Sequence, residues 1–268
     1  MPWAVYFFAR VYNPNVMPLF GTGMSLALWT EVQRERARSI IGVAPILFIM
    51  PQFHMSGLML IPAALLILWL SPTRLNLPWL AAGVLAGLCA YIPYFRGEMA
   101  HGWQNTAGMF TGGVHHTWDA LKAIIAPFNF LVSWSPRWTR SAGEYRAMGR
   151  ACFGWFGVFL AFNILSAVVA GFLTAGAFLR LKTASRGLFQ SPCAAFARSP
   201  GILFLAIMAI VPLIAYLLAW RSFNSRYYLA MLPAFFALTA HGAVQWLAVP
   251  RFARGFKAAL ILRIAAWI

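Results

Sequence analysis

Long apolar stretches alternate with short polar segments, most of them basic, along the 268 residues of this chain. Several of these stretches approach or reach the ~20 residues with which an α-helix crosses a bilayer. The pattern predicts an all-α fold, a polytopic transmembrane helical bundle with about seven complete spans and a partial span at each end. The expected spans cover residues 16–30, 39–50, 55–70, 79–94, 152–178, 201–220 and 227–249.

The segment 96–150 departs from this alternation because it is long and mixed in polarity. Within it, Thr117 followed by Asp119 is typical of a helix start. Apolar residues then recur near helical spacing from Leu121 to Phe128. We therefore expect an outer-side loop that carries a short helix lying in the membrane interface.

Residues 1–268 are expected to form a single transmembrane domain. Within it, Gly83 and Gly87 give the fourth span a small face suited to close helix packing. The chain opens without a basic segment before its first apolar residues, which does not fit a signal peptide. Because both ends fall inside apolar runs, we expect a fragment of a longer membrane protein.

Composition agrees with a membrane protein and limits its partners. The chain is 62% hydrophobic and 10% charged, whereas soluble domains have roughly 25% charged residues. Its net charge of +16 could suggest nucleic-acid binding, but the basic residues punctuate the apolar runs and form no stripe or tail. We therefore exclude a nucleic-acid partner and assign these charges to topology and to lipid headgroups.

The positive-inside rule gives a consistent topology. When the segment 31–38 is placed in the cytoplasm and the sides alternate, most basic residues of the short loops fall on the cytoplasmic side. The turn at 221–226 is the exception, because it is short and basic yet lies on the outer side. A charge placed against the rule indicates another role, such as binding an anion.

The residues of this turn suit a lipid phosphate. Arg221 and Arg226 present planar forks of donors that match phosphate oxygens. Tyr227 and Tyr228 follow at an expected helix start, where free N–H groups also favour an anion. The alternative is that the arginines reach bulk lipid phosphates while the tyrosines anchor the helix.

Two other outer segments hold candidate residues. Gln52 and His54 lie in the shortest outer turn, where His54 could donate a hydrogen bond to a phosphate, move a proton or cap a helix. Glu98 is the outer acid closest to the end of a span, and its alternative role is an ion pair with Arg96 or Arg221. No spacing of cysteines, histidines and acids fits a metal site, so we expect neither a metal nor a cofactor.

The order of several short segments is similar to that of a known superfamily. These segments resemble bacterial GT-C glycosyltransferases, close to the glycosyltransferase 39 and aminoarabinose-transferase-like proteins. The resemblance covers most of the chain and is carried by Arg10–Pro14 with Pro18–Phe20, Pro51–Ser56, Tyr91–Tyr94 with Glu98, Asn105 with Thr106, and Ser225–Tyr228 with Leu232 and Pro233.

The resemblance implies a multi-pass enzyme of the bacterial inner membrane. Such an enzyme transfers a sugar from a polyprenyl-phosphate donor to a lipid, glycan or protein on the outer side. It also implies that Arg226, which matches the family's Arg-Tyr near a late span, faces the lipid phosphate. The family's catalytic acid lies in the first outer loop, and we expect that residue to lie outside this chain because no Asp precedes Asp119.

Two other functions remain as alternatives. A transporter or flippase for a polyprenyl-linked glycan would use similar phosphate contacts, but it is expected to carry acids deep inside its spans or matching halves. The sequence shows no internal repeat and no acid within an expected span, which counts against it. A non-catalytic membrane remnant that is stable beside other subunits is the third alternative.

Overall fold

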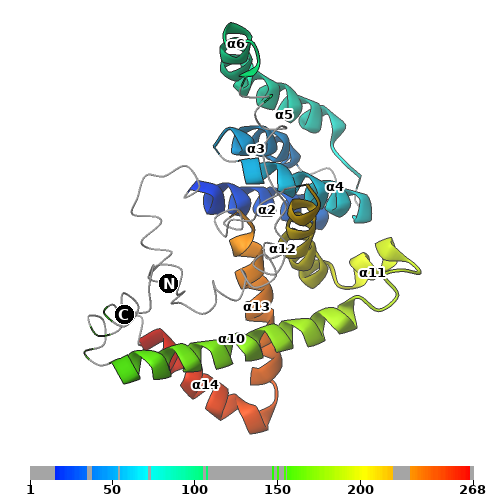
Figure 1. Ribbon diagram of the computed structural model, residues 1–268. Helices are drawn as coiled ribbons and strands as arrows, with labels where there is room; N and C mark the ends of the chain where they lie inside the picture. The colour runs from blue at the N-terminus through cyan, green and yellow to red at the C-terminus, as the bar shows by residue number, and fades with distance from the viewer. Residues whose placement is uncertain are drawn as a thin grey trace. The chain divides into compact units, whose positions relative to one another are not determined.

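The computed structural model describes residues 16–34, 38–53, 55–71, 74–104, 156–219 and 230–265, together with residues 107, 147, 150 and 154. No strand occurs among these residues, which confirms the all-α prediction for the described part of the chain. In chain order the helices are α2 (Met17–Gln33), α3 (Ile40–Phe53), the 3-10 helix η2 (Met55–Met59), α4 (Leu60–Leu70), α5 (Leu77–Ala90), α6 (Ile92–Ala100), α10 (Phe156–Ala184), α11 (Pro192–Arg198), α12 (Pro200–Ala219), α13 (Leu232–Leu247) and α14 (Pro250–Ala265) (Figure 1).

Proline marks the start of several of these helices. Pro18, Pro78, Pro93 and Pro192 lie in the first turn of α2, α5, α6 and α11. A proline costs little there, because the first N–H groups of a helix have no partner within it. Between α5 and α6 only Tyr91 interrupts the helical backbone.

Two helical segments are long and apolar enough to cross a membrane, namely Leu77–Ala100 and Ile164–Ala184. A third would be the pair Pro192–Arg198 and Pro200–Ala215, which is bent by 115°. These segments support association of the chain with a membrane. Other expected spans are shorter apolar helices, among them Ile40–Pro51 and Gly57–Leu70, so the count of seven stays a prediction.

The chain divides into two compact units. The first unit contains Met1–Val11, Ile125–Thr183 and Ala237–Ile268, and the second contains Tyr12–Ile124 and Ala184–Phe236. Each unit thus combines segments that lie far apart in the sequence.

In the second unit, α3 packs closely on α5 through the two predicted glycines. A Cβ at Gly83 would overlap the carbonyl group of Ile41, and a Cβ at Gly87 would overlap the ring of Phe48. Both glycines are buried. The prediction that Gly83 and Gly87 form a packing face is therefore confirmed. Without side chains at these positions, the two backbones approach more closely than larger residues allow.

In the first unit, α10 meets α13 through another pair of glycines. A Cβ at Gly242 would overlap the carbonyl oxygen of Leu173, and Gly176 faces the backbone of Gly242. The indole Nε1 of Trp246 donates a hydrogen bond of 2.6 Å to the carbonyl oxygen of Phe172. The two rings also meet edge to face, with 5.4 Å between their centroids.

Candidate functional site

The contacts of α2 show how the chain returns through the second unit. Near the carboxyl end of α2, Trp29 packs edge to face on Phe204, close to the start of α12, with 5.2 Å between the ring centroids. Near its amino end, Gly21 lies against Ala230, since a Cβ there would overlap the carbonyl oxygen of Ala230. Ala230 is the first described residue after α12. The chain therefore starts α12 beside one end of α2 and comes back to the other end.

Helix α4 and the 3-10 helix η2, which precedes it, both pack against α12. The thiol of Cys193, in α11 just before α12, lies 3.9 Å from the carbonyl oxygen of Trp69, near the carboxyl end of α4.

The direction of α5 follows that of α3. Gly83 faces Ile41, and Gly87 faces Phe48 seven residues further along α3. The ring of Phe48 also meets Tyr91 edge to face, with 5.7 Å between their centroids. The start of α6 therefore lies beside the carboxyl half of α3.

These contacts bring distant segments to one end of the second unit. Gly57 of η2 lies against Met50 near the end of α3, as a Cβ at Gly57 would come within 2.6 Å of the Met50 Cβ. Gly23, two residues after Gly21, lies against Ile46 of α3, since a Cβ at Gly23 would come within 3.6 Å of the Ile46 Cδ1. We call this region the shared end and define it by Gly21, Met50, Gly57, Tyr91 and Ala230.

The opposite end carries the residues that the topology assigns to the cytoplasmic side. There, the Arg38 guanidinium lies 5.7 Å from the ring centroid of Trp79, a cation–π contact. The contacts of Trp29 with Phe204 and of Cys193 with Trp69 belong to this end as well. The described residues that flank the expected outer segments and those that flank the expected inner segments therefore lie at different ends of the second unit.

The structure describes only part of the predicted site. The backbone of Gln52 belongs to α3, and the structure does not describe its side chain. Five other predicted residues lie outside the described part of the chain, namely His54, Arg221, Arg226, Tyr227 and Tyr228. The nearest described residues to these positions are Phe53, Met55, Ala219 and Ala230.

Glu98 is the predicted site residue whose side chain the structure describes. It lies in α6 and only 2% of its surface is exposed. Its carbonyl oxygen accepts hydrogen bonds from the N–H groups of His101 (3.2 Å) and Trp103 (2.9 Å). These close α6 with a left-handed turn, in which Gly102 and Trp103 have φ angles of 63° and 62°. A bulky residue rarely adopts this conformation, so Trp103 is a strained residue in the segment that follows the shared end.

Glu31 is a candidate residue that the sequence reasoning assigned to a polar loop. The structure extends α2 through Gln33, so Glu31 lies in its last turn and is fully buried. The signal was present in the sequence, because Gly21, Met24 and Leu28 lead to Glu31 at steps of three and four residues. All four lie on the buried face of α2.

The environment of Glu31 opposes its ionisation. Neither carboxylate oxygen has a hydrogen-bond partner of good geometry among the described residues. Burial raises the pKa of the Glu31 carboxyl above its usual value of 4.5, and a backbone interaction with Asn76 offsets part of this effect. Glu31 lies beyond Thr30, the last residue of the first expected span. Glu31 and Glu98 both lie outside the expected spans 16–30 and 79–94, yet both are buried.

Within the described residues, no group of three or more histidines, cysteines and acids could hold a metal ion. Comparison of the chain with protein-family models, curated proteins and solved structures gives no match. The candidate site is therefore defined by the residues and contacts of this chain itself.

Proposed function

We propose that the chain is a GT-C-type membrane glycosyltransferase that transfers a sugar from a polyprenyl-phosphate donor to a lipid, glycan or protein acceptor. In this proposal it crosses a bacterial inner membrane about seven times, and the shared end faces the outer side. The residues assigned to the donor are Gln52, His54, Glu98, Arg221, Arg226, Tyr227 and Tyr228.

The observation that carries the proposal is the shared end itself. The described residues that flank the 52–54 turn, the 221–229 segment and the α6 segment converge there, although they are separated by up to about 200 positions in sequence. The same contacts place Arg38, Trp69 and Trp79 at the other end. This separation supports the topology in which Arg221 and Arg226 lie outside, against the positive-inside rule.

The chemistry assigned to the arginines follows from charge development during transfer. As the bond from the sugar's anomeric carbon to the phosphate oxygen breaks, its electron pair stays on the departing phosphate. A guanidinium fork held at that phosphate stabilises the growing charge more than it stabilises the intact donor. Arg226 is therefore expected to act mainly on the rate of transfer.

A transfer assay with the full-length gene product and a polyprenyl-phosphate sugar tests this role. Arg226→Ala should lower transfer roughly 10- to 100-fold, because a charge-assisted hydrogen bond contributes about 1.5–3 kcal/mol. Arg74→Ala is the control, since Arg74 is exposed and follows α4 at the opposite end. Unchanged transfer and donor binding in Arg226→Ala would remove the assigned role.

A second candidate function, a transporter or flippase for a polyprenyl-linked glycan, is favoured by Glu31. A buried carboxyl is typical of proton-coupled sites in membrane proteins. Glu31 is fully buried at the end of α2, and its carboxylate oxygens have no hydrogen-bond partner of good geometry among the described residues. The same reconstituted chain separates the two functions. A transporter moves the glycan-lipid across the bilayer and leaves its bonds intact, whereas a glycosyltransferase releases the polyprenyl phosphate.

A further inference from the structure

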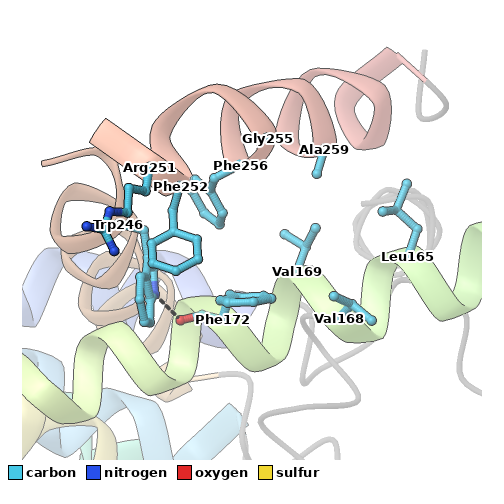
Figure 2. Close-up of a pocket in the computed structure, with 10 residues that line it drawn as sticks. All are labelled: Leu165, Val168, Val169, Phe172, Trp246, Arg251, Phe252, Gly255, Phe256 and Ala259. Atoms are coloured by element: carbon cyan, nitrogen blue, oxygen red, sulfur yellow. Dashed lines mark hydrogen bonds between the residues drawn. The ribbon is translucent and has the colours of Figure 1, made fainter. Parts of the chain in front are cut away.

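The first unit contains an apolar cavity that shares no lining residue with the shared end. It has a volume of about 220 Å³ and lies between α10 and α14, with Trp246 of α13 at its margin. Figure 2 shows Arg251 and Trp246 at one end of the cavity and Leu165 and Ala259 at the other. The cavity thus has one end with a cation and one that is wholly apolar.

The residues that line the cavity are apolar apart from Arg251, so they favour a hydrocarbon chain as the ligand. Val169 and Phe256 are buried between the two helices, and Phe172 and Phe252 close the side near Trp246. The cavity is open to the surface, because Val168, Phe172 and Phe252 are about half exposed. A hydrocarbon chain that covers this apolar surface removes it from water, which is favourable. The α10 segment that lines the cavity spans seven residue steps, or about 10 Å at 1.5 Å per residue. This length suits part of an extended lipid chain.

Arg251 is the cation that lines the cavity, and it favours an anion at the open end. Arg251, Arg254 and Lys257 are exposed on α14. No Asp or Glu follows Glu144 anywhere in the sequence, so α10, α13 and α14 contain no acid that could neutralise these cations. Cations beside a membrane attract anionic lipids by about 1 kcal/mol each. The complementary partner is therefore a lipid that combines a phosphate with a hydrocarbon chain.

We propose that the α10–α14 cavity binds an anionic phospholipid, with an acyl chain between Val169 and Phe256 and the phosphate at Arg251. The site does not depend on the proposed transferase function. On the predicted topology α14 follows the seventh span on the cytoplasmic side, whereas the donor site lies on the outer side. The occupant is accordingly a phospholipid of the surrounding membrane and differs from the sugar donor.

Trp246 provides the reporter for a direct test. The full chain is reconstituted in phosphatidylcholine nanodiscs that contain increasing fractions of phosphatidylglycerol with brominated acyl chains, which quench nearby tryptophans. The Trp246 signal is the difference between the unmodified chain and Trp246→Phe. We expect brominated phosphatidylglycerol to quench this signal at lower mole fractions than brominated phosphatidylcholine does, because only the former adds an anionic headgroup.

Two variants locate the bound lipid. Gly255 lines the cavity and a Cβ there meets no atom within 4 Å, so Gly255→Leu should fill the cavity without a backbone clash and abolish the selective quenching. Gly171→Leu is the matched control, since Gly171 has the same open surroundings on α10 but does not line the cavity. Arg251→Gln should raise the half-quenching fraction of phosphatidylglycerol about fivefold, and Arg74→Gln should leave it unchanged.

Three results would overturn the proposal. Equal quenching by the two brominated lipids would mean that Trp246 reports only on bulk lipid. Selective quenching that survives both Gly255→Leu and Arg251→Gln would place the lipid elsewhere. Displacement of phosphatidylglycerol by equimolar polyprenyl phosphate would assign the cavity to the donor instead.

Discussion

Glu31 shows how a single residue can oppose the stability of the fold that contains it. Its carboxyl is buried at the end of α2 and has no hydrogen-bond partner of good geometry among the described residues. An ionised carboxylate in such a place is costly, so the folded state favours the protonated form. Unfolding exposes the group to water, where it ionises at its usual pKa.

This environment gives a stability difference that depends on pH. The pKa of Glu31 is higher in the folded state than its ordinary value of 4.5. The unmodified chain therefore loses stability as the pH rises from 4.5 through the folded-state pKa. Glu31→Gln removes that loss. Thermal unfolding of the purified protein should show a higher midpoint for Glu31→Gln at pH 8 and equal midpoints below pH 4.5.

The control for a change in net charge is Arg74→Gln, at an exposed position. It should not reproduce the pH-dependent gain. A gain of equal size at both pH values in Glu31→Gln would contradict the proposed burial effect.

At the scale of helices, small residues decide which elements meet closely. Gly83 with Gly87 joins α5 to α3, and Gly176 with Gly242 joins α10 to α13. In a membrane, lipid chains cover apolar side chains as well as protein does, so close backbone contact rather than hydrophobicity selects the partner helix. Gly83 and Gly87 therefore position the start of α6 beside α3, which forms one part of the shared end.

The close contact of Gly83 with α3 predicts that two Gly-to-Ala substitutions have opposite effects on stability. Gly83→Ala places a methyl group on the carbonyl group of Ile41 and should destabilise the protein by about 1–3 kcal/mol, because the backbone cannot yield easily. Gly42→Ala lies on the opposite helix with no atom within 4 Å of the new Cβ and should instead stabilise it by about 0.5–1 kcal/mol. Thermal unfolding of both variants measures the difference, and equal effects would rule out the close contact.

The sequence predicted where the helices form better than it predicted which helices pack against each other. Apolar runs and prolines located most of the helices, and the spacing of Gly83 and Gly87 identified a true packing face. Periodicity could not show which helices meet, because the apolar residues surround most helices on all sides and both lipid and protein can cover them. Glu31 was assigned to a loop because its charge was given more weight than its helical spacing. The side chains of Gln52, His54 and the Arg221–Tyr228 segment lie outside the described structure, so their roles stay predictions.

At the scale of the whole molecule, the proposal depends on which side of the membrane each segment occupies. His101 follows α6 and Gln190 precedes α11, and both are exposed. On the predicted topology they lie on opposite sides. With the native Cys89, Cys152 and Cys193 replaced by alanine, His101→Cys should react with an impermeant maleimide in intact cells.

The reverse is expected for Gln190→Cys, which should react only after the cells are lysed. The comparison requires no knowledge of the substrate, because it measures only access from each side. Labelling of both cysteines in intact cells, or of Gln190→Cys alone, would contradict the assigned orientation.

The central claim is that a polyprenyl phosphate binds at the shared end, and photo-crosslinking tests it most directly. A polyprenyl phosphate with a diazirine close to the phosphate is irradiated with the reconstituted protein, and mass spectrometry identifies the labelled peptides. We predict labels within residues 50–57, 98–104 and 220–231, and a marked loss of label in Arg226→Ala but not in Arg74→Ala. Labels confined to α10 and α14, or to the opposite end at residues 69–79, would contradict the account.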